Sequence, residues 1–415
     1  MKKILLALSL LCLATVLLQA REVIANQGIK LQFSTDAVFL DTVFSTVGSS
    51  TYQLRVFNPS SEKVVIDNIS LGRGPASDYR INVNGTPTRQ ISEVEILPKD
   101  SIYIFIEVTN AVKGNTEMLY VDSILFNNKG TAQNVKLVTL TKPAYFHYPT
   151  NFVQLGNTVI PYSVIRGNQT WTGDKPHLIY GYALVDSGSV LNINTGAEVH
   201  FHQNSGLWIG NGGSLKVGAN ATNPGIDSVL FAGDRLEPFY EDIPGQWGGA
   251  LGGIFLQGGS INNSISNAVI KNATTALRLD STLTKNLDIT YSYILNSSRT
   301  GIFGGYGNMD AHSLVVANAG VHLFYAFGGD YEFRQCTFAN YWDQSTRTTA
   351  AVAISNYLDI QNDAGQNVRL VRDLSQADFG NCLIDGNNQQ ELTVLEDNGG
   401  NLELPDRSRY PQTRY

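Results

Sequence analysis

Cysteine, proline and charged side chains are all scarce in this sequence. Its 415 residues include 3 cysteines, 13 prolines and 16% charged residues. Cys12 lies in an apolar segment near the N-terminus, which leaves Cys336 and Cys382, too few for a disulfide scaffold. Long amphipathic helical stretches are also absent, so the sequence argues against a helical fold.

Excess positive charge is missing too. The formal net charge is -7, and loss of Lys2 and Lys3 with an N-terminal leader would give -7 - 2 = -9. The few basic residues are scattered along the chain rather than clustered. We therefore expect no nucleic-acid partner and no binding to anionic membranes.

The first 20 residues have the pattern of a secretory signal peptide. Lys2 and Lys3 precede an apolar run from Ile4 to Leu18, and the small residue Ala20 offers a cleavage site. The run is shorter than the roughly 20 apolar residues that span a bilayer. We predict an exported protein of the cell envelope, the outer surface or the medium, with no transmembrane segment after cleavage.

Glycine, aromatic and β-branched residues dominate what remains, which predicts an all-β chain. Residues 21–149 contain short alternating segments separated by turn residues, a pattern typical of an immunoglobulin-like antiparallel β-sandwich. The predicted strands are Val38 to Phe44, Tyr52 to Phe57, Lys63 to Leu71, Tyr79 to Val83, Val94 to Leu97, Ile102 to Val108, Leu119 to Phe126 and Val135 to Leu140.

A repeat of about two dozen residues follows, which predicts a right-handed parallel β-helix over residues 150–391. Similar segments start at Ile265, Ile289, Ala311, Phe333 and Phe379, with spacings of 24, 22, 22 and 46 residues. We interpret the last spacing as two coils. Each segment places two residues of one strand face inward, and four of the five segments end in asparagine.

The asparagines predict a structural stack along the axis of the β-helix. Its members are Asn272, Asn296, Asn318 and Asn340. Side-chain amides stacked in this way can hydrogen-bond to one another at the bend after each strand.

The same alignment gives Cys336 and Cys382 one position in the repeat. Two coils of separation would hold them about 9 to 10 Å apart, beyond the Cα separation that a disulfide tolerates. We therefore predict two buried free thiols. After Asn387 no further repeat is visible, and residues 392–415 are predicted to form a partial cap or a disordered tail.

The run from Gly212 to Arg235, the sequence PGQWGG from Pro244 to Gly249 and the asparagine-ended repeats resemble uncharacterised exported β-helix proteins of Gram-negative bacteria. Those proteins carry an immunoglobulin-like N-terminal domain. The repeat is also similar to the pectin lyase fold, whose members cleave acidic polysaccharides or bind glycans. The resemblance implies fold and export rather than a reaction.

A glycine-rich insertion before Trp247 is the predicted ligand-binding segment. Tyr240, Glu241, Asp242 and Trp247 bring aromatic rings and carboxylates together on one loop, where they could contact a sugar. The alternative is structural: Trp247 covers the flank of the coil, and the carboxylates belong to a solvated acidic loop.

No catalytic residue, metal site or cofactor site is predicted. His200 and His202 share a strand face but have no third ligand at a suitable spacing. Arg409, Pro411 and Arg414 match a short lyase motif, yet they lie in a polar tail without its partner motifs.

We therefore expect a non-catalytic surface or envelope protein that uses a wall of the β-helix for adhesion or for binding a polysaccharide or cell-surface glycan. The alternative is a polysaccharide lyase or glycoside hydrolase of the same fold. Stacked carboxylates and a basic residue in one groove on consecutive coils would favour the enzyme.

Overall fold

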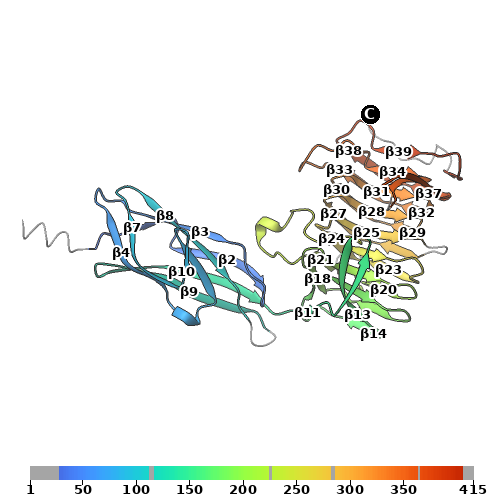
Figure 1. Cartoon of the computed structure of the whole chain (residues 1–415). Helices are drawn as coiled ribbons and strands as arrows, with labels where there is room; N and C mark the ends of the chain where they lie inside the picture. The colour runs from blue at the N-terminus through green and yellow to red at the C-terminus, as the bar shows by residue number, and fades with distance from the viewer. Residues whose placement is uncertain (1–27, 112–115, 224–226, 282–285, 363–364, 405–415) are drawn as a thin grey trace, which may run out of the picture. The chain divides into compact units, whose positions relative to one another are not determined.

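The computed structural model describes residues 28–111, 116–223, 227–281, 286–362 and 365–404 (Figure 1). Two compact units are present, residues 1–143 with Leu236–Pro238 and residues 144–235 with 239–415. The predicted signal peptide lies outside the described residues. Within the described ranges, no helix is long and apolar enough to cross a membrane.

The first unit contains two five-stranded sheets, as expected for a β-sandwich. One sheet has the order β1-β3-β8-β5-β6, and the other has the order β2-β10-β9-β4-β7. All pairs are antiparallel except β10 with β2. The strands are β1 Gln32–Phe33, β2 Ala37–Phe44, β3 Tyr52–Phe57, β4 Val64–Leu71, β5 Tyr79–Val83, β6 Thr86–Thr88, β7 Gln90–Ile96, β8 Ser101–Val108, β9 Met118–Asn128 and β10 Thr131–Lys142, and a short 3-10 helix, η1, covers Gly74–Ala76.

Alternating side chains build the core of this unit. On β8, Ile102, Ile104 and Ile106 are buried, whereas Tyr103 and Phe105 are each 40% exposed. A strand with one buried face produces this period of two.

The second unit is a parallel β-helix, so the predicted all-β fold class is confirmed. Three parallel sheets run along the coil, and each coil contributes one strand to each sheet (Figure 1). The nine-stranded sheet contains β11 Tyr145–His147, β15 His177–Ile179, β18 Glu198–Phe201, β21 Val229–Gly233, β24 Ala268–Lys271, β27 Tyr293–Ser297, β30 Val315–Ala319, β33 Thr337–Asn340 and β38 Leu383–Gly386.

The ten-stranded sheet begins with an antiparallel hairpin, β12 and β13, and is parallel from there on. Its strands are β12 Asn151–Leu155, β13 Thr158–Ile165, β16 Tyr182–Val185, β19 Gly206–Ile209, β22 Ile254–Leu256, β25 Thr275–Asp280, β28 Thr300–Gly305, β31 His322–Phe327, β34 Val352–Ser355 and β39 Leu392–Leu395. The eight-stranded sheet contains β14 Asn168–Trp171, β17 Val190–Ile193, β20 Ser214–Val217, β23 Asn263–Ser266, β26 Leu287–Thr290, β29 Asn308–His312, β32 Gly329–Arg334 and β37 Leu374–Gly380.

The predicted repeat corresponds to this register. Ile270, Ile294, Val316, Phe338 and Ile384 are register partners on consecutive coils, and all five are fully buried. Burying each such side chain stabilises the fold by about 1.5 to 3 kcal/mol.

The last long spacing is one coil, not two. Strand β33 pairs directly with β38, and an antiparallel hairpin, β35 Tyr357–Gln361 with β36 Asn367–Val371, is inserted in the coil between them. The predicted separation of Cys336 and Cys382 is therefore wrong, because the extra residues form this insertion. Both thiols are free, with Cys336 buried and Cys382 partly exposed.

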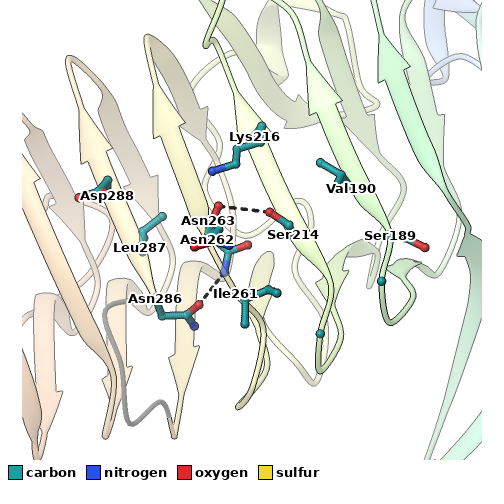
Figure 2. A pocket seen from close by; sticks show the side chains of 12 residues that line it. Ser189, Val190, Ser214, Lys216, Ile261, Asn262, Asn263, Asn286, Leu287 and Asp288 are labelled. Carbon is teal, nitrogen blue, oxygen red and sulfur yellow. Dashed lines mark hydrogen bonds between the residues drawn. The ribbon is translucent and has the colours of Figure 1, made fainter.

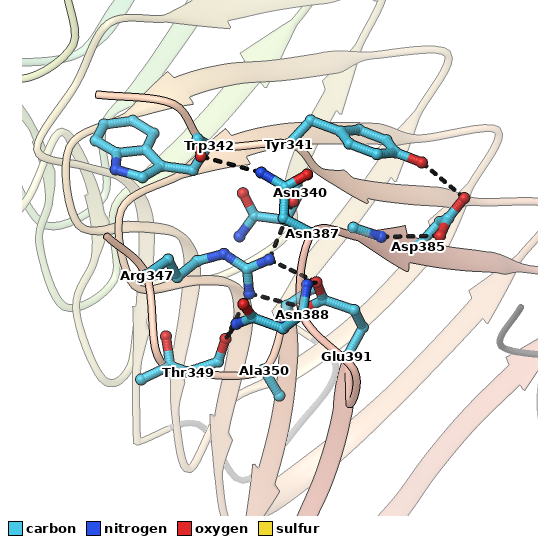
Figure 3. Close-up of polar contacts among 12 residues, drawn as sticks. Asn340, Tyr341, Trp342, Arg347, Thr349, Ala350, Asp385, Asn387, Asn388 and Glu391 are labelled. Carbon is cyan, nitrogen blue, oxygen red and sulfur yellow. Dashed lines mark hydrogen bonds and ion pairs between the residues drawn. The ribbon is translucent and has the colours of Figure 1, made fainter. Parts of the chain in front are cut away.

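A buried ion pair closes the last coil (Figure 3). Arg347 Nη2 and Nη1 lie 2.5 and 2.8 Å from Glu391 Oε1 and Oε2, and the two side chains are 2% and 5% exposed. Strand β39 then pairs with β34, so residues 392–395 add a strand that the sequence pattern did not reveal. Leu402 forms a parallel bridge to Leu374, and residues 405–415 lie outside the described part.

Candidate functional site

Four carboxylates follow one line on the outer face of the eight-stranded sheet. Asp288, Asp310, Glu332 and Asp378 are successive register partners on β26, β29, β32 and β37. Their strand neighbours point into the core, so these side chains project from the wall. We call these four residues the acidic column; neighbouring members are about 4.8 Å apart along the axis.

Polar residues extend the wall on all sides of the acidic column. Ser264 and then Lys216 continue the same line toward earlier coils. His312 and Arg334 form a neighbouring line on one side, and Asp330 lies on the other side. The wall thus combines carboxylates with a smaller number of basic groups.

Arg334 forms ion pairs with Glu332 and Asp378, the last two members of the acidic column. Its Nη2 lies 2.8 Å from both Glu332 Oε1 and Asp378 Oδ2. Burial lowers the pKa of Arg334, but the hydrogen bond and charge of Asp378 and the charge of Glu332 outweigh it, so the pKa is raised. Asp378 is buried, and its Oδ1 has no hydrogen-bond partner among the described residues. The guanidinium of Arg334 therefore lies between two carboxylates of the acidic column.

Asp330 differs from these two carboxylates. Burial raises its pKa, and the negative charge of Asp310 raises it further. Asp310 on β29 is the register partner of Glu332, which lies two residues after Asp330 on β32. The Cα atoms of Asp310 and Asp330 are therefore about 8 Å apart. The wall therefore holds two nearby carboxyl groups, and the pKa of one of them, Asp330, is raised.

A pocket of about 600 Å³ adjoins Asp288, the first member of the acidic column (Figure 2). Lys216 and Asp288 line it together with Val190, Ile261 and the turn at Gly188. Its floor includes buried amides: Asn263 Nδ2 donates to Asn286 Oδ1 at 2.6 Å. Amide and carboxylate groups around a partly apolar hollow can hydrogen-bond to the hydroxyl groups of a sugar.

The predicted binding loop has a more structural arrangement. Trp247 is 1% exposed, stacks on Phe201 with ring centroids 4.1 Å apart, and donates from Nε1 to the carbonyl of Lys271 at 2.8 Å. Its ring thus has no open face for a ligand. It covers the flank of the coil, which is the alternative considered above.

The other three loop residues are not assembled into a site. Tyr240 belongs to a second 3-10 helix, η2 Pro238–Tyr240, and its ring lies under the guanidinium of Arg235. Glu241 and Asp242 are exposed, and Glu241 is 4.0 Å from the Lys271 ammonium.

Asparagines occupy successive bends, but they share few direct bonds. Asn272, Asn296 and Asn318 all have positive φ, and Asn318 Nδ2 donates to Asn296 Oδ1 at 3.3 Å. Asn272 instead donates to the carbonyl of Glu241, and Asn340 bonds to the backbone of Ala319.

His200 and His202 have protein partners. The ring of His200 lies 2.8 Å from the Gly233 carbonyl, and His202 Nδ1 lies 2.7 Å from Asp234 Oδ2, a hydrogen bond that raises the pKa of His202. Among the described residues, no group of three or more His, Cys, Asp or Glu side chains could hold a metal ion.

The acidic column could have been found from the sequence. The repeat segments at Ile289, Ala311, Phe333 and Phe379 each begin one residue after one of its carboxylates. Starting the alignment one residue earlier would have shown the acidic column directly. To recognise that Arg334 and Asp330 lie beside the acidic column, the register between the strands must also be known.

Comparison with known proteins gives no sequence relative: no family model and no curated protein matches. Among solved structures, a family 123 glycoside hydrolase of Clostridium perfringens is similar with a TM-score of 0.22 and 7% identity, over 29% of this chain and 30% of that chain. The Escherichia coli chaperone DraB is similar with a TM-score of 0.20 and 11% identity, over 32% and 70% of the two chains. A GH87 alpha-1,3-glucanase catalytic domain in complex with nigerose is similar with a TM-score of 0.22 and 10% identity, over 87% and 80%. The chain spans less than a third of the length of the first of these.

Proposed function

We propose that this chain is an exported glycan-binding protein and that the acidic column with its adjoining pocket is the binding surface. The observation that carries the proposal is the alignment of four carboxylates on consecutive coils beside a pocket that polar and apolar groups line together. A ligand that extends along the coil axis could meet a carboxylate acceptor on the coils of Asp288, Asp310 and Glu332, whereas Asp378 is buried against Arg334. Polysaccharides have that form.

The charge of the wall supports a neutral glycan rather than an acidic one. Asp288 and Asp310 add negative charge beyond the Glu332–Arg334–Asp378 cluster, and the whole chain is also acidic. Uronate or phosphate groups would be repelled there, whereas neutral hydroxyl groups can donate to carboxylates. The same repulsion between carboxylates and phosphate groups argues against nucleic acid as the ligand.

A panel of polysaccharides tests the binding proposal. Affinity electrophoresis in gels that contain neutral glucans, mannans or galactans, or acidic polygalacturonate or alginate, should retard the chain with a neutral polymer. Asp310→Asn with Asp288→Asn should weaken the retardation at least tenfold. The matched control is Glu241→Gln with Asp242→Asn, which removes two exposed loop carboxylates and should leave binding unchanged; the reverse result would assign binding to the loop.

Hydrolysis is a second candidate, favoured by the raised pKa of Asp330 and by the nearby carboxylate of Asp310. An inverting glycosidase uses a protonated carboxyl group as the acid and a second carboxylate as the base, roughly 6.5 to 9.5 Å apart. Asp330, whose pKa is raised, would protonate the glycosidic oxygen, and Asp310 would take a proton from the attacking water.

Product release separates hydrolysis from binding alone. If the wall hydrolyses its glycan, new reducing ends should appear, and Asp330→Asn should lower the rate about 10²-fold to 10⁴-fold while retardation in the gel is kept. Asp280→Asn, on the ten-stranded sheet, is the control that should retain the rate. Retardation without reducing ends would leave glycan binding as the function.

A further inference from the structure

Two cysteines occupy neighbouring strands at the end of the β-helix. Thr337 and Leu383 are register partners on β33 and β38, and Cys336 and Cys382 immediately precede them. Neighbouring strands are about 4.8 Å apart, which lies within the Cα separation of about 4.4 to 6.8 Å found for disulfides. Backbone register therefore permits a bond that the two-coil estimate excluded.

The contacts of the two sulfur atoms lie around the same strand ends, at β32 and at the start of β33. Cys382 Sγ lies 3.4 Å from the backbone nitrogen of Cys336, and it also approaches the carbonyl of Phe333 at 3.6 Å. Cys336 Sγ lies 3.3 Å from the neighbouring carbonyl of Arg334. The interaction between the two thiols lowers the pKa of Cys336 and raises that of Cys382.

We infer that Cys336 and Cys382 are a disulfide-forming pair that links β33 to β38 and locks the last coil. The oxidant is a second disulfide, either of a small thiol or of a dithiol oxidase. The thiolate of one cysteine attacks one of its sulfur atoms and expels a thiolate; the other cysteine then attacks the sulfur atom of the first and expels the second thiolate. Two protons and two electrons pass from the cysteines, and the oxidant leaves as two thiols.

The disulfide would close a loop of the chain that includes most of the last coil of the β-helix. Residues 337–381 lie between the cysteines and include Arg347 and the β35–β36 hairpin. Closing so long a segment restricts the unfolded chain, so the oxidised protein should melt several degrees higher than the reduced protein.

Oxidation of the purified, reduced chain by glutathione disulfide tests the pair. After free thiols are blocked with N-ethylmaleimide, digestion without reduction should yield one peptide pair joined through Cys336 and Cys382, from a monomer. Recovery of both cysteines as maleimide adducts, a glutathione adduct retained on either cysteine, or a cross-linked dimer would each overturn the inference.

Two variants make the test specific. Cys336→Ser lacks the second thiol of the pair and should retain glutathione on Cys382. The Cys336→Val and Cys382→Val double variant keeps apolar side chains at both positions, and its melting temperature should not respond to the oxidant. A thermal shift of equal size in this variant would show that the response of the natural chain has another origin.

Discussion

Replacing Glu391 by glutamine tests how the last coil is held. Both carboxylate oxygens accept backbone hydrogen bonds, Oε1 from Asn388 at 2.7 Å and Oε2 from Ala351 at 2.8 Å, as well as bonds from Arg347 (Figure 3). Whichever way the glutamine amide turns, its NH₂ group meets an N–H donor. Arg347, 2% exposed, would also lose its counter-charge.

Breaking a buried ion pair by removing one partner costs about 3 to 5 kcal/mol. We expect Glu391→Gln to lower the free energy of unfolding by that amount in urea denaturation followed by circular dichroism. Glu396→Gln, at an exposed position five residues away, should change it by less than about 0.5 kcal/mol. Arg347→Met with Glu391→Leu should recover most of the loss. If Glu391→Gln stayed within about 1 kcal/mol of the natural chain, the buried pair would not be what closes the coil.

Three further predictions concern the coil and its wall. Burial lowers the pKa of His147 to about 4 and that of His177 to about 3, so both imidazoles are neutral in the folded chain. Their contribution to the free energy of unfolding is complete above about pH 6.5, and it is lost as the pH falls through 4 and 3. His147 alone should cost roughly 3 kcal/mol by pH 4, and urea titrations of His147→Gln should show a flatter acid loss than those of the natural chain. Trp247→Ala should lower the free energy of unfolding by about 3 to 5 kcal/mol without changing glycan retardation; a loss of retardation in a folded variant would return Trp247 to the binding site. Arg334→Met should destabilise the chain in urea, because Asp378 would remain buried without its counter-charge, and an unchanged denaturation midpoint would show that this cluster is not structural.

The sandwich could be predicted closely from the sequence because its strands alternate between one buried and one exposed face. The predicted segment Tyr52 to Phe57 coincides with β3, and Ile102 to Val108 differs from β8 by one residue. In the β-helix, inward positions such as Ile294 and Val316 also repeat visibly, because the core accepts only apolar side chains of similar size there.

Insertions and outward positions were harder to predict. The β35–β36 hairpin lengthened one coil to the apparent size of two, and only strand pairing reveals that Cys336 and Cys382 are neighbours. Outward residues need no common hydrophobicity, so a repeat sought in the core passes over Asp288 and Asp310. Trp247 could not be assigned from its glycine-rich surroundings, because stacking on Phe201 depends on where the loop re-enters the coil.

The most direct test of the acidic column as the functional surface is equilibrium binding to a neutral polysaccharide identified by the gel panel. Isothermal titration of the natural chain, the Asp288→Asn with Asp310→Asn variant and the Glu241→Gln with Asp242→Asn variant should show at least a tenfold weaker affinity for the wall variant alone. Equal affinities of the wall variant and the natural chain, with both variants folded, would contradict the proposal.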